Sequence, residues 1–195
     1  MAFDPKKVGF AVITSYPKWY SGKIRSIKHT DKVRGDLAIE FAQKATDAGY
    51  PIVLSDGKSA KTFVRMLQSL PGLIVTKRKS VMSGQGKRLA LEMVSKIPGV
   101  EVIVLCEPEK VSFLTHCVER SVMPILEGKA DIVVPKREDK LFKSTYPDYM
   151  YLSEKEANSI YNEAIVANNL LPKEMYEMDS FFGPRVFRNT KEFVS

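Results

Sequence analysis

Short runs of apolar residues alternate along the chain with segments whose apolar residues recur at helical spacing. Continuous apolar runs bounded by turn formers predict buried strands, which we expect at residues 8–14, 51–54, 73–76, 101–106 and 131–134. Helical spacing predicts the helices 36–48, 60–70, 86–96 and 111–128, and Pro124 is expected to kink or divide the last one. Such alternation predicts an α/β fold with a mostly parallel, doubly wound sheet.

Beyond residue 143 the chain becomes more polar and aromatic, and the pattern predicts one further helix over residues 153–168. We expect that helix to begin with a capping box from Ser153 to Glu156. Gly49 directly follows the helix predicted at 36–48, where a glycine is a common C-cap. With 195 residues, the chain fits one domain, or one domain with a small appendage.

Charge and cysteine content narrow the classes of protein. A net charge of +7 favours anionic partners such as nucleotides. Cys106 and Cys117 lack metal-site spacing, which argues against a disulfide framework or a zinc site and indicates free thiols in a reducing compartment. No apolar run approaches the roughly 18 residues of a membrane span, and the first residues do not resemble a signal peptide. We therefore expect a cytoplasmic protein without a transmembrane segment.

Two carboxylates stand directly after the apolar strand predicted at 101–106, in Glu107-Pro108-Glu109. Ligands of open α/β sheets bind at the carboxyl ends of the strands, and residues two apart in an extended segment share a side. Mg²⁺ and Mn²⁺ take carboxylate and phosphate oxygens, so the pair predicts a divalent-metal site for a phosphorylated substrate. The alternative is two solvated glutamates that stabilise the dipole of the following helix.

Three more motifs follow strands or open helices: Thr14-Ser15-Tyr16, Ser55-Asp56-Gly57, and Gly84-Gln85-Gly86-Lys87. Together with the carboxylate pair, and in this order, they resemble the nucleotide-sugar-binding half of GT-A glycosyltransferases of the family-2-like group. The resemblance covers roughly residues 8–135. It implies a GT-A three-layer sandwich, a nucleotide-diphospho-sugar donor, and Mn²⁺ or Mg²⁺ as cofactor. Here the family's D-x-D motif is E-x-E, and Leu89-Ala90-Leu91 stands where Ala-Arg-Asn is usual.

The resemblance also implies roles for single residues. Ser15 and Tyr16 would hold the nucleoside, with Tyr16 stacking on a base or ribose, and Asp56 would accept a hydrogen bond from the base. Glu107 and Glu109 would hold the metal, with Glu109 the direct ligand. Lys87 is the expected phosphate contact. Three structural alternatives stay open: Tyr16-Pro17 as only a loop with a half-buried aromatic, Asp56 as an ordinary turn and cap residue, and Lys87 as part of a solvated helix start.

The C-terminal part holds an acid, an aromatic pair and an arginine within residues 178–185. This segment resembles the acceptor-side loop of several GT-A enzymes, which would make Asp179 an acceptor base and Arg185 a phosphate contact. Alternatively, the two phenylalanines anchor the loop in the core and Asp179 is a cap. The expected organisation is one GT-A-like domain, with a nucleotide-sugar-binding part at 1–135 and an acceptor-side part at 136–195 that ends abruptly enough to suggest truncation.

Two other functions are compatible with the same architecture. One is a nucleotidyltransferase that makes a nucleotide-sugar, although its loop after the first strand would normally be richer in glycine than residues 15–25 are. The other is a catalytically degenerate GT-A module that only binds. Cations alternate with Trp19 and Tyr20 in the loop after the first strand, a composition compatible with nucleic-acid binding. No RNA-binding signature accompanies them, so we expect no specific nucleic-acid partner.

Overall fold

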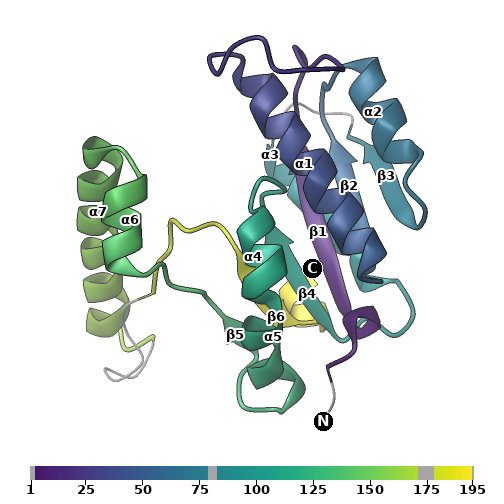
Figure 1. The fold of residues 1–195 in the computed structure, drawn as a ribbon. Coiled ribbons are helices and arrows are strands. Elements are labelled where there is room, and N and C mark those ends of the chain that lie inside the picture. The colour runs from purple at the N-terminus through teal and green to yellow at the C-terminus, as the bar shows by residue number, and fades with distance from the viewer. Residues whose placement is uncertain (1–2, 79–82, 171–177, 195) are drawn as a thin grey trace. The chain divides into compact units, whose positions relative to one another are not determined.

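The computed structural model describes residues 3–78, 83–170 and 178–194 (Figure 1). Its mixed α/β fold is built on a sheet with the strand order β3-β2-β1-β4-β6-β5. The first four strands in this order are parallel, and β6 runs antiparallel to both of its neighbours. The strands are β1 (Val8–Thr14), β2 (Ile52–Asp56), β3 (Leu73–Lys77), β4 (Val102–Cys106), β5 (Ile132–Val133) and β6 (Arg185–Arg188). The prediction of a mostly parallel sheet is confirmed.

Eight α-helices and one 3-10 turn are present in the described part of the chain. They are η1 (Pro5–Lys7), α1 (Thr30–Asp47), α2 (Lys61–Gln68), α3 (Ser83–Ser95), α4 (Val111–His116), α5 (Val118–Leu126), α6 (Asp139–Thr145), α7 (Asp148–Ala167) and α8 (Lys191–Val194). None of them is long and apolar enough, within the described residues, to cross a membrane.

The two faces of the sheet are covered by different helices, because successive side chains of a strand point to opposite faces. On one face Phe10 of β1 packs edge-on against Phe41 of α1 at 5.5 Å between ring centroids. On the other face Ala11 of β1 shares a core cluster with Ala90 and Val94 of α3. Figure 1 shows α1 and α2 in front of the strands and α3 behind them.

The end of α1 has the backbone geometry that the sequence predicted. Gly49 has a φ of +83°, which a side chain would disfavour. The amide of Gly49 bonds the carbonyl of Thr46, and the amide of Tyr50 bonds the carbonyl of Ala45, both at 3.0 Å. This pair of bonds is a Schellman motif, so the predicted C-cap is confirmed.

Two local predictions are wrong. The region 111–128 divides at Cys117, between α4 and α5, whereas Pro124 lies inside α5. Helix α7 begins at Asp148, so Ser153 lies within it and its hydroxyl bonds the carbonyl of Met150 instead of capping a terminus. In addition, no strand was predicted where β6 enters the sheet between β4 and β5.

The chain divides into two compact units. The first contains residues 1–133 together with 185–195, because β6 and α8 return to the sheet. The second contains residues 134–184, with α6 and α7 as its helices. The sequence placed the division after residue 135 and assigned everything beyond it to one part.

Gly9 of β1 provides a test of the packing between the sheet and α3. A methyl group at Gly9 would lie 2.5 Å from Val94 Cγ2 and 3.0 Å from Val100 Cγ1. Overpacking of this kind costs about 1–3 kcal/mol, so Gly9→Ala should lower the urea midpoint of unfolding accordingly. Gly84→Ala is the matched control, since no atom lies within 4 Å of its added methyl group. Equal stability of the two variants would contradict the packing described here.

Candidate functional site

The carboxyl ends of β1, β2, β3 and β4 meet at one edge of the sheet because these strands are parallel. From β1 the chain proceeds to β2 and β3 on one side, and α3 then returns it to β4 on the other side. The strand order therefore reverses between β1 and β4. In open α/β sheets the crevice outside such a reversal is the usual ligand site. Thr14, Asp56 and Cys106 are the last residues of the three central strands at this edge.

Asp56 connects the ends of β1 and β2. Its side chain is buried, and Oδ1 accepts a hydrogen bond from the Thr14 hydroxyl at 2.8 Å. Oδ2 accepts a longer bond from the Ser59 amide at 3.3 Å, and the Ser59 hydroxyl in turn accepts one from the Tyr16 amide at 2.8 Å. Asp56 thus fixes the turn after β2 against the turn after β1. This contact supports the turn-and-cap alternative and leaves carboxylate lone pairs for a further donor.

Arg78 is the least expected side chain at this edge. It directly follows β3, its residue is only 8% exposed, and its backbone amide bonds the Asp56 carbonyl. Within the described ranges, neither Nε nor Nη1 has a hydrogen-bond partner. The guanidinium lies against two glycines: a methyl group on Gly57 would collide with it, and one on Gly86 would lie 2.6 Å from Nη1. These glycines leave room for a buried cation whose donors are unsatisfied.

Glu109 connects the edge of β4 to the loop after β1. Its Oε1 accepts a hydrogen bond from the Tyr16 hydroxyl at 2.7 Å and an ion pair from Arg34 Nε at 2.6 Å. Burial raises the pKa of Tyr16 far above its usual value, and the charge of Glu109 raises it further. The Tyr16 ring is 2% exposed and packs edge-on against Phe63. The expected stacking of this ring on a nucleobase does not fit such burial.

Glu107 differs from Glu109 in having an unsatisfied oxygen. Its Oε2 is buried and accepts no hydrogen bond from the residues that the structure describes. The segment 107–110 is a turn, closed by a bond from the Lys110 amide to the Glu107 carbonyl at 3.1 Å, and not the extended segment that the sequence predicted. An orphaned carboxylate oxygen in such a turn fits a hard divalent cation that completes its shell with phosphate and water oxygens. No cluster of three or more acidic, histidine or cysteine side chains occurs in the described chain. A metal here would therefore depend on the substrate for further ligands.

The three remaining predicted contacts lie near the same edge in different settings. Ser15 is exposed directly after β1. Lys87 is exposed in the first turns of α3, which begins at Ser83, earlier than the sequence predicted. Arg185 opens β6 and stands opposite Leu105 of β4, because antiparallel pairing brings the start of β6 to the carboxyl end of β4. All three belong to the first unit.

In the second unit, Asp179 is the centre of a buried network. Arg137 forms two parallel bonds to its carboxylate, Nε to Oδ2 at 2.6 Å and Nη2 to Oδ1 at 2.8 Å. Asn158 donates to Oδ1, and the guanidinium also pairs with Glu154 and lies over the Phe142 ring. Burial raises the pKa of Asp179, but the bonds from Arg137 and Asn158 outweigh it and keep the pKa below its usual value.

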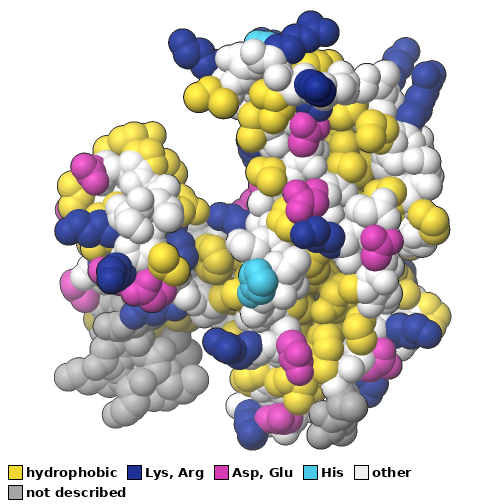
Figure 2. All heavy atoms as spheres, in the orientation of Figure 1, with side chains coloured by type: hydrophobic (Ala, Val, Ile, Leu, Met, Phe, Trp, Pro, Cys, Tyr) yellow, Lys and Arg dark blue, Asp and Glu magenta, His cyan; other side chains and the backbone are white. Residues whose placement is uncertain are grey.

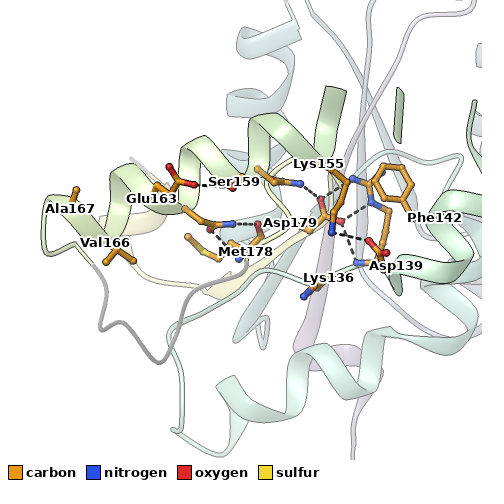
Figure 3. A pocket seen from close by; sticks show the side chains of 13 residues that line it. Lys136, Asp139, Phe142, Lys155, Ser159, Glu163, Val166, Ala167, Met178 and Asp179 are labelled. Atoms are coloured by element: carbon orange, nitrogen blue, oxygen red, sulfur yellow. Dashed lines mark hydrogen bonds and ion pairs between the residues drawn. The ribbon is translucent and has the colours of Figure 1, made fainter. Parts of the chain in front are cut away.

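The Arg137 backbone amide adds a fourth hydrogen bond, to Oδ2 of Asp179 at 3.2 Å. Such a carboxylate is a weak base, because a proton must compete with these four bonds. The role of Asp179 as acceptor base stays a prediction that this geometry does not favour. The same network borders a cavity of about 600 Å³ within the second unit (Figure 3). One wall is α7, whose Asn162 bonds both the amide and the carbonyl of Met178. The network holds the segment 178–180 against α7.

Sequence reasoning missed two arginines, Arg34 and Arg78. Arg34 forms an ion pair with Glu109, far along the chain, and no local pattern reveals such a pair. Arg78 was detectable in part, because it follows a strand at the ligand edge of the sheet. The glycines that surround it, Gly57 and Gly86, were noted in the sequence as turn formers, whereas their structural role is to admit the guanidinium.

No protein-family model and no curated protein sequence matches the chain. Among solved structures, the fold is similar to the crystal structure of a "putative nucleotide-diphospho-sugar transferase" from Desulfovibrio desulfuricans G20. The two share 10% sequence identity with a TM-score of 0.47, over 65% of this chain. The match spans 56% of the length of that protein. A likeness at this level carries no argument about function.

The burial of Tyr16, together with its bond to Glu109, should make the stability of the protein depend on pH in the alkaline range. Because the pKa of Tyr16 is raised from 10.0 in the folded state, its contribution is complete below about pH 10 and is lost as the pH rises further. Tyr16→Phe should cost about 1 kcal/mol at neutral pH. It should also make the unfolding free energy, measured in urea, fall less steeply above pH 10. Tyr149→Phe, at a 72% exposed tyrosine, is the control. Identical slopes for the wild type and Tyr16→Phe would refute this coupling.

Proposed function

We propose that the chain is a metal-dependent glycosyltransferase with the GT-A fold, which takes a sugar from a nucleotide diphosphate sugar bound at the carboxyl edge of β1, β2 and β4. The observation that carries the proposal is the buried guanidinium of Arg78, whose Nε and Nη1 have no partner in the described part of the chain. Burying an unpaired charge costs several kcal/mol. A ligand that brings acceptor oxygens to this position recovers that energy on binding.

The chemistry of Arg78 favours a nucleotide over a neutral metabolite. A guanidinium presents a planar fork of donors that matches phosphate and carbonyl oxygens. It lies beside the Asp56 turn, so a donor and an acceptor are available to one ligand. Asp56 retains the role that the resemblance implied, which is to accept a hydrogen bond from the base. Ser15, exposed at the end of β1, is placed to bond the ribose.

The diphosphate would lie toward β4, where Glu107 and Glu109 would hold a divalent metal. The orphaned Oε2 of Glu107 is the better ligand, because Oε1 of Glu109 already accepts bonds from Tyr16 and Arg34. This reverses the expected order of the two acids. A bound Mg²⁺ or Mn²⁺ would neutralise the charge that develops on the leaving diphosphate.

Tyr16 and Arg34 would act by positioning. Together they fix the Glu109 carboxylate, which otherwise has several rotamers available. Lys87 and Arg185 would add positive charge on either side of the diphosphate, from α3 and β6 respectively. Cations placed where negative charge develops stabilise the transition state more than the ground state. The predicted role of Asp179 as acceptor base is the least supported part of the proposal, because Arg137 and Asn158 already occupy its carboxylate.

The replacement Arg78→Met separates stability from function. Removing an unpaired buried cation should raise the unfolding free energy of the free protein by about 1–3 kcal/mol. The same change should weaken nucleotide binding roughly 100-fold, since losing a buried charged donor costs about 2–5 kcal/mol. Calorimetric titration with UDP, GDP and their sugars, with and without Mn²⁺, measures the second effect. Arg88→Met, at an exposed arginine of α3, is the matched control.

The same calorimetric titration, with and without Mn²⁺, tests the metal dependence of nucleotide binding. Glu107→Gln should abolish the increase in affinity that Mn²⁺ causes, while Glu109→Ala should reduce it less. Wild-type protein that binds no nucleotide in any of these combinations would refute the donor site. Arg78→Met that is destabilised, and binds as tightly as the wild type, would show that the guanidinium has a structural role only.

A further inference from the structure

The loop between β1 and α1, residues 15–29, exposes two large aliphatic side chains. Ile27 is 86% exposed and Ile24 is 49% exposed. They lie three residues apart in a segment without regular secondary structure. Their spacing is therefore not that of an amphipathic helix packed against another element. Single exposed apolar residues are ordinary on protein surfaces. Two large exposed aliphatic side chains in one short loop are less common and indicate a candidate contact surface.

The charge of this loop has a single sign. Between residues 15 and 30 the sequence contains four cations and no Asp or Glu; the cations are Lys18, Lys23, Arg25 and Lys28. All four are exposed, and none forms an ion pair with any residue that the structure describes. Figure 2 shows Lys and Arg side chains gathered around the loop at the top of the molecule, with hydrophobic side chains beside them. The four cations and the two isoleucines are thus exposed residues of one short loop.

Other residues of the loop are anchored by packing and hydrogen bonds, so the exposure of the isoleucines does not result from a lack of loop contacts. Trp19 is 4% exposed, packs against Phe63 and donates to Asp36 at 3.0 Å. The Tyr20 hydroxyl contacts His29 Nδ1 at 2.9 Å and accepts the Arg25 amide at 3.1 Å. These anchors fix the two ends of the loop. Ile24 and Ile27 lie on the part between them.

We propose that this loop binds the surface of an anionic lipid bilayer. Lysine and arginine near such a surface are attracted by its negative potential, with a gain of roughly fivefold in affinity for each cation. Aliphatic side chains between them enter the boundary between head groups and acyl chains. The stems of the lysines are apolar and lie along that boundary while their charges stay in water.

The same surface fits nucleic acid less well. Binding of single strands relies on aromatic side chains on which bases stack. Trp19 is buried, and Tyr20 is engaged with His29 and with the Arg25 guanidinium, which lies 5.0 Å from its ring centroid. The apolar side chains that the loop does expose are aliphatic. They gain nothing from a phosphate backbone but gain affinity in a lipid interface.

The proposal does not depend on the proposed glycosyltransferase activity, although the two are compatible. The loop leaves β1 at the carboxyl edge of the sheet, where Arg78, Glu107 and Glu109 also lie. Adsorption through the loop would turn that edge toward the bilayer. Lipid binding and nucleotide binding can be measured separately, so failure of one does not imply failure of the other.

Sedimentation with vesicles tests the proposal. The whole chain should bind phosphatidylcholine vesicles that contain phosphatidylserine, and should not bind pure phosphatidylcholine. Ile24→Ser combined with Ile27→Ser should weaken binding at least about tenfold, because two aliphatic groups no longer leave water. Leu152→Ser combined with Ile160→Ser, at side chains 64% and 61% exposed in α7, is the matched control and should bind as the wild type does.

A second pair of variants tests the charge. Lys23→Gln combined with Lys28→Gln should weaken vesicle binding about 25-fold. Lys140→Gln combined with Lys143→Gln changes net charge equally at exposed positions of the second unit and should have little effect. Raising NaCl from about 0.15 to about 1 M shortens the Debye length from about 8 to about 3 Å and should release most of the protein. Thermal unfolding of each variant verifies that it folds.

Two results would overturn the proposal. One is the absence of binding to the anionic vesicles. The other is a combination of three findings: the Lys23→Gln/Lys28→Gln variant binds vesicles more weakly, the Ile24→Ser/Ile27→Ser variant binds them as the wild type does, and the wild type binds poly-uridine RNA as strongly as it binds vesicles. That second result would identify the loop as a general polyanion surface, with nucleic acid as its better ligand.

Discussion

The parallel pairing of β1 with both β2 and β4 is the constraint from which the candidate site follows. It places the ends of three strands at one edge, where the order of the strands reverses. Side-chain bonds then connect those ends, Thr14 to Asp56 on one side and Tyr16 to Glu109 on the other. Loops after β1, β2 and β4 are thereby fixed relative to one another. A ligand at this edge would meet groups that are already in place, which reduces the ordering cost of binding.

Arg78 lowers the stability of the free protein at this edge of the sheet. An unpaired buried guanidinium is unfavourable in the free protein, and the packing of Gly57 and Gly86 around it leaves no room for larger side chains. The network in the second unit is the opposite case. There Nε and Nη2 of Arg137 are bonded to Asp179, and Nη2 also pairs with Glu154, so the charge holds the structure together. The two buried arginines thus differ in whether protein acceptors meet their donors, and the proposed binding role of Arg78 rests on that difference.

The strands could be predicted because continuous apolar runs in a parallel sheet are local signals, and 8–14 is reproduced as β1. The start of α1 could not, because its first turns contain Lys32, whose burial depends on contacts with Trp19, Tyr20 and Asp36. β6 was missed for a similar reason, since its partner β4 lies far earlier in the sequence. Of the candidate site, the sequence predicted the acids Asp56, Glu107 and Glu109 but not the arginines beside them. Acids at strand ends form a local pattern, whereas a buried arginine is recognised only through its neighbours.

Nuclear magnetic resonance of the Arg78 side chain tests the central claim most directly, because it observes the atom on which the claim rests. In the free protein the Nε–Hε group has no acceptor among the described residues. Titration with a nucleotide diphosphate sugar and Mg²⁺ should shift its resonance saturably, and the resonance should be absent from Arg78→Met. A nucleotide that binds while the Arg78 resonance stays unchanged would contradict the account, since the ligand would then be held elsewhere.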